Sequence, residues 1–251
     1  MGRDRMFLPF SFALVSAMIG IMNIKNQKIL YTEKTPYGMV KIVDTEDQRI
    51  LYINDHIESA VYNDGEKKNE LVFPYMQRFS YAFAVHPEIK KTLLIGGGAF
   101  SYPRYYLNQY PDCCIDVVEI SPEILRADET YFHLKQLLTE RMHIITEDGF
   151  VYLAEHQDQY DLIINDAFLG GKEEGRDEKA MHVIHEHLCA HGIYMINTAA
   201  ALKGAFSYEF HRVSADLKKE FKNTAVLPCE EDRSPYEKQN VLLIASDDSL
   251  L

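Results

Sequence analysis

The sequence predicts an α/β protein in which a small antiparallel β domain precedes a doubly wound, parallel sheet. Two observations lead to this prediction. Between residues 28 and 61, apolar and polar side chains alternate in short segments that are separated by turn residues. From about residue 70 onward, continuous apolar segments alternate with segments of helical period. This second pattern is typical of a parallel sheet that helices cover on both faces.

The N-terminal segment, residues 1–27, belongs to neither domain. Met6 to Met22 contains seventeen residues without a charge, which is at the lower limit for a membrane span and long for the core of a signal peptide. No small-x-small cleavage site follows it. A membrane anchor, a peripheral apolar helix and an incorrectly assigned start codon all stay open as interpretations.

Residues 28–68 form the predicted β domain. We expect its strands within three segments, "KILYTEKT", "GMVKIVDT" and "RILYINDHIESAVY", with turns supplied by "TPYG" and "DTEDQ". The polar stretch from Tyr62 to Asn69 contains a glycine and marks the boundary with the second domain.

The second domain, residues 69–251, is expected to begin with a helix over Glu70 to Val85. Strands are then predicted at "KTLLIGG", "CIDVVEI", "MHIITED" and "YDLIIND". The helices between them are predicted at "YPRYYLNQY", "PEILRADETYFHL" and "FVYLAEHQ". A further helix and strand lie within "EKAMHVIHEHLCAHGIYMINTA", and a helix at "EFHRVSADLKKEF" and a strand at "NVLLIAS" complete the domain.

Charge and composition restrict the classes of function. The formal net charge of −12 argues against a nucleic-acid binder, which would normally present a basic face, and is compatible with a cationic substrate. The four cysteines show no CxxC spacing, so we expect free thiols in a reducing, cytoplasmic compartment and no zinc site.

Two further features allow alternative interpretations. His182 and His185 share a face of a predicted helix, so a metal site is conceivable. No carboxylate partner is evident from the sequence, so we expect a His-rich surface helix and no metal. The charged, glycine-containing loop from Leu169 to Lys179 is interpreted either as a lid over a site or as a solvated loop.

The candidate site residues follow the predicted strands. In a doubly wound sheet, ligands bind at the carboxyl ends of the strands, and here those ends carry glycines and acids. The residues are Gly96, Gly97 and Gly98 after the first strand, Glu119 with Ile120 after the second, Asp148 with Gly149 after the third, and Asp166 after the fourth.

This combination predicts a nucleoside site. Glycines let the backbone approach a ligand, Glu119 lies at a spacing suited to the ribose hydroxyls, and Asp148 could accept a hydrogen bond from the amino group of a base. A pyrophosphate site needs a third glycine, but Ser101 stands there and Pro103 lies in the first helical turn. A ligand without phosphate, such as an S-adenosyl compound, suits these residues better.

Several segments together resemble the spermidine synthase family of class I S-adenosylmethionine-type transferases. "LYTEKTPYGMVKIVD" and "RILYINDHIESA" are similar to that family's N-terminal β domain. "TLLIGGG", "IDVVEISPEILRADETYF", "RMHIITEDGFVYL" and "YDLIINDAF" are similar to its strand ends, and "HLCAHGIYMIN" to its later helix-to-strand segment. The resemblance extends from about Leu30 to Ser246 and implies a Rossmann-like, methyltransferase-type sheet.

The resemblance also implies roles for the candidate residues. The three glycines would line the methionine-like and ribose part of S-adenosylmethionine or its decarboxylated form. Glu119 would bind the ribose diol, and Asp148 with Gly149 would recognise adenine. Asp166 lies where the family has a catalytic aspartate, which orients or deprotonates an attacking amine. Because this cofactor is supplied in the cytosol, a membrane-anchored form would keep the catalytic domain inside.

Four departures from the family's pattern affect the predicted substrate. Ala99 replaces the acid of G-G-G-D-G-G, and Asp166-Ala167-Phe168-Leu169 lacks the second acid of D-S-S-D. Phe73-Pro74-Tyr75 stands for a Tyr-His-Glu trio, and Glu58 stands for a glutamine. With the acids that hold a polyamine largely lost, putrescine is expected to bind poorly, because a buried ammonium ion needs a charged partner.

The sequence therefore favours a spermidine synthase-like transferase that carries out methyl transfer to an unknown small acceptor, such as an amine. The alternatives are an aminopropyltransferase with a substituted polyamine pocket and a non-catalytic nucleoside-binding protein. Phe100 pointing into the pocket would favour the non-catalytic alternative, whereas an open channel that reaches Asp166 would favour an enzyme. A homodimer and a membrane association through the N-terminal segment stay open.

Overall fold

The computed structural model describes residues 27–167, 176–230 and 232–250. The apolar segment from Met6 to Met22 lies outside the described residues, and so do residues 169–175 of the expected lid. Within the part of the chain that the structure describes, no helix has both the length and the apolar character that a membrane crossing requires.

The β domain is a four-stranded antiparallel sheet rather than the predicted three segments. Its strands follow the chain order and are β1 (Lys28–Thr35), β2 (Gly38–Asp44), β3 (Gln48–Ile53) and β4 (His56–Tyr62). The third predicted segment is divided by a turn at Asn54 and Asp55, whose φ angles are 49° and 65°. Two consecutive residues with positive φ are typical of the tight hairpin turns that match the twist of the strands, and Asn and Asp tolerate this conformation.

The second domain contains the predicted doubly wound sheet. Its seven strands lie in the order β10-β11-β9-β8-β5-β6-β7. They are β5 (Lys91–Ile95), β6 (Cys114–Val118), β7 (Met142–Ile145), β8 (Tyr160–Asn165), β9 (Leu188–Ala200), β10 (Asn223–Pro228) and β11 (Gln239–Ser246). The strands from β9 to β7 are parallel, whereas β11 is antiparallel to both β9 and β10. The edge strand β10 is absent from the sequence prediction.

The helices agree with the predicted segments except for the first. The helices are α1 (Pro74–Gln77), α2 (Tyr81–Val85), α3 (Ser101–Gln109), α4 (Pro122–Tyr131), α5 (Gly149–Glu155), α6 (Glu178–Glu186) and α7 (Tyr208–Glu220), with short 3-10 turns η2 (Arg78–Ser80) and η3 (Leu134–Gln136). The helix expected from Glu70 starts at Pro74, because proline fixes a helical φ but offers no N–H, and so suits the first helical position.

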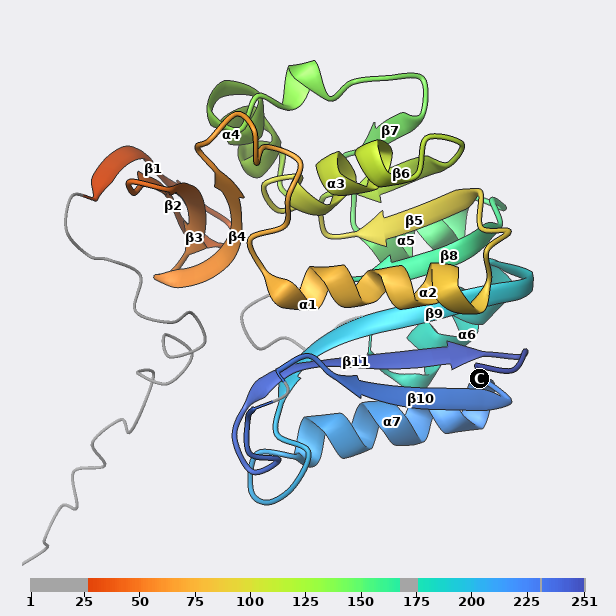
Figure 1. The fold of residues 1–251 in the computed structure, drawn as a ribbon. Helices are drawn as coiled ribbons and strands as arrows, with labels where there is room; N and C mark the ends of the chain where they lie inside the picture. The colour runs from red at the N-terminus through yellow and green to blue at the C-terminus, as the bar shows by residue number, and fades with distance from the viewer. Residues whose placement is uncertain (1–26, 168–175, 231, 251) are drawn as a thin grey trace, which may run out of the picture.

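Two apolar cores cover the two faces of the large sheet, between the sheet and the helices that flank it in Figure 1. Successive residues of a strand point to opposite faces. Leu94 accordingly packs with α1, α2 and α3, and its neighbours Leu93 and Ile95 pack with α5, α6 and α7. A third core joins the two domains, because residues of β2 and β3 pack against Ile124 and Ala127 of α4. The β domain is thereby held beside the carboxyl ends of the large sheet.

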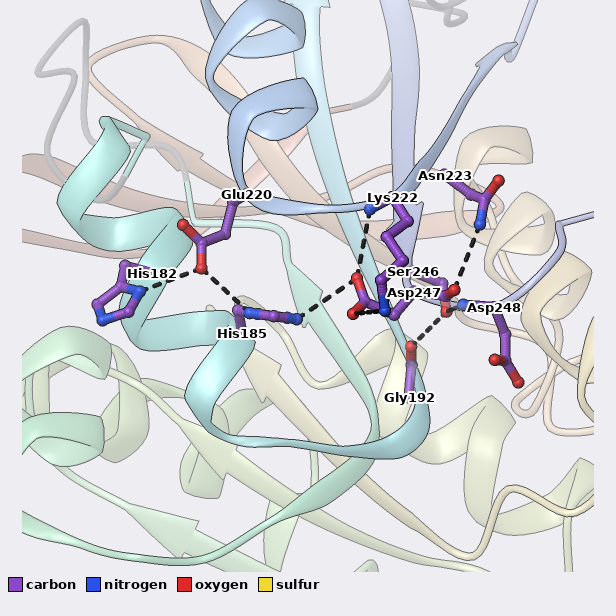
Figure 2. Close-up of polar contacts among 9 residues, drawn as sticks. All are labelled: His182, His185, Gly192, Glu220, Lys222, Asn223, Ser246, Asp247 and Asp248. Atoms are coloured by element: carbon purple, nitrogen blue, oxygen red, sulfur yellow. Dashed lines mark hydrogen bonds and ion pairs between the residues drawn. The ribbon is translucent and has the colours of Figure 1, made fainter.

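The two histidines of α6 belong to a polar network at the end of α7 and β11 (Figure 2). The Nδ1 atoms of His182 and His185 each lie 3.0 Å from Oε1 of Glu220. Nε2 of His185 lies 3.5 Å from Asp247, which also accepts a bond from Lys222. The expectation that these histidines have no carboxylate partner is therefore wrong. Among the described residues, no group of three or more His, Cys, Asp or Glu side chains is suited to hold a metal ion.

We predict that Glu220→Gln lowers stability more at pH 5.5 than at pH 8.5. Glu220 raises the pKa of His182 through its hydrogen bond. The stabilisation is complete below the unfolded-state pKa of histidine and is lost as the pH rises through the raised value. Urea unfolding of both proteins across this range measures the difference. Glu155→Gln, an exposed change on α5, is the control, and an equal effect of both variants at all pH values would contradict the prediction.

Candidate active site

A cavity of about 450 Å³ opens at the carboxyl ends of β5 and β8. The strand order reverses between these two strands, and in doubly wound sheets this reversal is where ligands bind. All the candidate residues from the sequence line the cavity, namely Gly96, Gly97, Gly98, Glu119, Ile120, Asp148, Gly149 and Asp166. The structure thus brings these residues together around one cavity, and their roles as site residues stay predictions.

The glycine loop needs its glycines for two reasons. Gly96 and Gly98 have φ angles of 98° and 52°, a region that side chains with a Cβ atom disfavour. A Cβ atom on Gly96 would lie 3.0 Å from the carbonyl oxygen of Asp166, and one on Gly97 would lie 2.8 Å from the ring of Phe100. The loop therefore lies directly against the residues around it, and its backbone forms the floor of the cavity.

The two unusual residues after the glycines point away from the cavity. Phe100 is fully buried in the core that contains α3 and does not line the cavity. Ala99 is also fully buried and packs in the core between the two domains. Phe100 therefore leaves the pocket open, and the cavity reaches Asp166, which is the arrangement that we associate with an enzyme.

Glu119 connects the glycine loop to the next strand. Its Oε2 accepts hydrogen bonds from the N–H groups of Gly97 at 2.9 Å and Gly98 at 3.3 Å, and its Oε1 accepts one from Ser121 at 2.9 Å. Burial raises the pKa of Glu119, and these backbone hydrogen bonds act in the opposite direction. The same carboxylate that is expected to bind a ribose diol thus also fixes the shape of the loop.

Asp148 is the N-cap of α5. Its Oδ1 accepts hydrogen bonds from the N–H groups of Phe150 at 2.8 Å and Val151 at 3.2 Å, so one oxygen satisfies the first turn of the helix. The residue also lines the cavity. Gly149 lies against Ile95, where an added Cβ atom would be 2.5 Å from that side chain. The expected recognition of adenine by this pair is compatible with the geometry and stays a prediction.

Asp166 follows β8 and is held by two neutral hydrogen-bond donors. Tyr75 donates its hydroxyl proton to Oδ2 over 2.9 Å, and the amide of Asn197 donates to Oδ1 over 2.9 Å. Burial raises the pKa of Asp166 to about 6, while these hydrogen bonds and the charge of Arg176 lower it. Tyr75 and Asn197 are functional candidates to which the sequence gave no role. Tyr75 precedes β5 and Asn197 lies near the end of β9, and only the folded sheet brings both side chains to Asp166.

Glu58 is the second carboxylate near Asp166, and it comes from the other domain. It lies on β4, is half-buried and lines the cavity. Burial and, to a smaller extent, the charges of Asp166 and Glu119 together raise its pKa to about 8. From the sequence Glu58 is only a departure from the family's glutamine. Its place in the site depends on how the two domains dock.

The docking of β4 onto the glycine loop brings Glu58 into the cavity. The hydroxyl groups of Ser59 and Ser101 lie 3.2 Å apart and are hydrogen-bonded. An added Cβ atom on Gly98 would lie 3.2 Å from the Cβ atom of Ser59. Tyr37, from the turn between β1 and β2, also lines the cavity, and its pKa is raised by burial and by the charges of Asp148 and Glu119.

The cavity is strongly acidic. Among the described residues that line it, the acidic ones are Glu58, Glu119, Glu147, Asp148, Asp166 and Asp177, and the only lysine or arginine is Lys179. A cavity that is lined by negatively charged carboxylates and by apolar side chains attracts cations. Its electrostatics therefore favour a cationic ligand, such as a sulfonium or an amine.

The strand order and the position of the cavity define a Rossmann-like protein of the methyltransferase type, preceded by a small β domain. Comparison with known families then gives a more specific result. The sequence model of the spermine/spermidine synthase domain matches residues 79–227, which is more than half of the chain. The chain belongs to this family, and the resemblance inferred from the sequence is confirmed.

Curated relatives are similar over part of their length. The polyamine aminopropyltransferase of Vibrio vulnificus is 28% identical over 166 residues, which cover 63% of this chain and 54% of the relative. That of Pyrobaculum calidifontis is 31% identical over 168 residues, which cover 63% of this chain and 56% of the relative. The chain thus spans about half the length of the curated relatives that it matches.

Solved structures confirm the fold. A probable spermidine synthase from Corynebacterium glutamicum superposes with a TM-score of 0.74 at 20% identity, covering 88% of this chain and 81% of that one. The spermidine synthase of Thermotoga maritima superposes with a TM-score of 0.70 at 18% identity, covering 88% and 73%. None of these comparisons supports the preference for methyl transfer, and the curated relatives favour the aminopropyl alternative.

We predict that Glu119→Ala abolishes binding of S-adenosyl compounds. The change removes the carboxylate expected at the ribose and leaves the N–H groups of Gly97 and Gly98 without their partner, so a loss of stability of about 1–3 kcal/mol is also expected. Calorimetric titration with methylthioadenosine and urea unfolding measure the two effects. An unchanged affinity would contradict the assignment of the site.

Proposed function

We propose that this protein is an aminopropyltransferase that uses decarboxylated S-adenosylmethionine and a small amine. The observation that supports this proposal most strongly is the acidic end of the cavity, where Glu58 and Asp166 lie close enough for their charges to interact. Membership of the spermine/spermidine synthase family supports it independently.

The donor follows from the charges of the cavity. Decarboxylated S-adenosylmethionine has a sulfonium and a terminal ammonium group and no carboxylate, so it is a dication that acidic walls attract. S-adenosylmethionine itself carries an additional carboxylate on the same side chain. That group would lie at the end of the cavity that Glu58 and Asp166 occupy, and repulsion between like charges would disfavour it.

The acceptor site is less depleted of acids than the sequence suggested. Ala99 and Ala167 indeed supply no carboxylate, but Glu58 faces the cavity near Asp166. Two neighbouring carboxylates can hold the ammonium group of an amine acceptor. In the sequence comparison Glu58 counted only as the replacement of a glutamine, and the docked β domain brings its carboxylate to the cavity that Asp166 also lines.

The chemistry requires alignment more than activation. The sulfonium makes its own attached carbon electrophilic, so the protein must hold an amine nitrogen in line with the carbon–sulfur bond and keep water away. Asp166 is fixed by Tyr75 and Asn197, and a carboxylate held in this way can orient the amine. The glycine loop and Glu119 would hold the nucleoside on the other side of the reacting carbon.

We expect decarboxylated S-adenosylmethionine to bind at least about tenfold more tightly than S-adenosylmethionine, because the carboxylate of the latter is repelled by the acidic end of the cavity. Calorimetric titration of the purified protein with both compounds and with methylthioadenosine measures this preference. Aminopropyl transfer to putrescine, followed by mass spectrometry, tests turnover. A preference for the carboxylated compound would instead support methyl transfer, and a lack of binding by all three would contradict any transferase.

Asp166→Asn is expected to leave methylthioadenosine affinity within about threefold of wild type and to reduce aminopropyl transfer at least about 100-fold, because the charge that orients the amine is removed together with one of the two acceptor oxygens of the side chain. Tyr75→Phe is the matched comparison, since it keeps the charge and removes one hydrogen bond, and its effect should be smaller. Equal losses of nucleoside binding and turnover in Asp166→Asn would indicate that Asp166 has only a structural role.

A further inference from the structure

We propose that Glu58, a residue of the β domain, is the general base that takes the proton from the attacking amine, and that Asp166 orients this amine without accepting its proton. This inference rests on the proposed aminopropyl transfer and adds a role for a residue that the sequence left without one.

A base is needed because the acceptor arrives in the wrong protonation state. Alkyl amines such as the lysine side chain have a pKa near 10.4, so at neutral pH the nitrogen carries an extra proton and has no free electron pair. Attack on the carbon of the sulfonium becomes feasible only after that proton has moved to a nearby group. Glu58 and Asp166 both line the cavity and interact electrostatically, and the proposed function assigns the amine to the part of the cavity beside them.

The contacts of Asp166 make it a weak proton acceptor. Both of its oxygens already accept hydrogen bonds, one from Tyr75 and one from Asn197. Hydrogen bonds to a carboxylate stabilise its ionised form, and here they offset part of the effect of burial, which still raises the pKa of Asp166 to about 6. These contacts hold the carboxylate in one orientation, which suits a group that positions a cation.

The surroundings of Glu58 have the opposite effect. No described residue donates a hydrogen bond to its carboxylate or forms an ion pair with it, and it faces the cavity. The ionisable groups around it are Asp166 after β8, Glu119 after β6 and the hydroxyl of Tyr75 on α1. None of these is a cation, so together with burial they favour the protonated form and raise its pKa to about 8. An ionised Glu58 is therefore the stronger base of the pair.

The position of Glu58 is fixed by its strand. The neighbouring residue Ser59 is buried, and its hydroxyl group is bonded to that of Ser101 at the start of α3. Adjacent residues of a strand point to opposite sides, but the strand as a whole is anchored against the glycine loop through Ser59 and Gly98. The backbone of Glu58 is thereby fixed beside the glycine loop, and its side chain lines the cavity.

An N–H proton of the bound ammonium ion moves to a carboxylate oxygen of Glu58, and the nitrogen retains the electron pair of that bond. This pair forms the new bond to the aminopropyl carbon, while the electron pair of the carbon–sulfur bond stays on sulfur. The sulfonium becomes the neutral thioether of methylthioadenosine, the nitrogen becomes a secondary ammonium ion, and Glu58 returns its proton to solvent after product release.

The first experiment is the pH dependence of kcat/KM for putrescine with decarboxylated S-adenosylmethionine. In wild type, activity should rise with pH through the value of Glu58, about 8. In Glu58→Gln the activity should fall about 100-fold or more, and the remaining rate should rise through the lower value of Asp166, about 6. Retention of the wild-type rate and of the wild-type profile in Glu58→Gln would overturn the proposal.

Asp55→Asn is the matched control for this variant. Asp55 precedes the same strand, is exposed and pairs with Lys41 outside the cavity, so its replacement makes the same chemical change without touching the site. It should keep the wild-type rate and pH profile. Methylthioadenosine should bind wild type, Glu58→Gln and Asp55→Asn with similar affinity, which shows that each variant is folded and retains the donor site.

A second measurement separates this inference from the proposed function. Putrescine is titrated at pH 7 into the methylthioadenosine complex in buffers of different ionisation enthalpy. Wild type should release close to one proton, because the arriving cation ionises Glu58, whereas Glu58→Gln should release almost none. Proton release from wild type that Glu58→Gln retains would overturn the role of Glu58 while aminopropyl transfer still stands. Binding of methylthioadenosine without any binding or turnover of putrescine would overturn the proposed function, and this inference with it.

Discussion

The arrangement of the site depends on one buried carboxylate, that of Glu119. It accepts hydrogen bonds from the N–H groups of two glycines after β5 and from Ser121 at the start of α4. These bonds connect the ends of β5 and β6, next to the point where the strand order reverses between β5 and β8, and they set the path of the glycine loop. That path in turn decides where the β domain can dock, because Ser59 lies directly against Gly98. The shape of the cavity floor and the docking of the β domain thus both depend on the hydrogen bonds of Glu119.

Most of the fold could be predicted from the sequence, because it follows from local patterns. Continuous apolar strands alternate with helical segments after residue 70, and the acids and glycines at their ends converge as the topology requires. The differences have local reasons. Proline at position 74 delays the first helix, and two residues with positive φ divide a long segment into β3 and β4. The edge strand β10 is exposed or half-buried along its whole length, so it lacks the continuous apolar pattern by which the other strands were predicted.

The site could be predicted only in part, and the missing part has a common cause. The glycines, Glu119, Asp148 and Asp166 belong to strand ends whose position follows from the sheet alone. Glu58, Tyr75 and Asn197 reach the site through domain docking or through the end of a later strand, and neither is encoded by local spacing. Ala99 illustrates the same limit. In the sequence, alanine at this position suggests that an acid has been lost, whereas in the structure Ala99 is buried where the two domains are in contact.

The contact between β4 and the glycine loop has a consequence for how this protein can diversify. The groups that would hold the nucleoside lie mainly after residue 69, whereas Glu58 comes from the hairpins before it. Substitutions in those hairpins can change which second molecule is accepted without altering the domain that would bind the nucleoside. The domain with the large sheet is in this sense constrained by the nucleoside ligand, whereas the β domain is free to change so that a different second molecule is accepted.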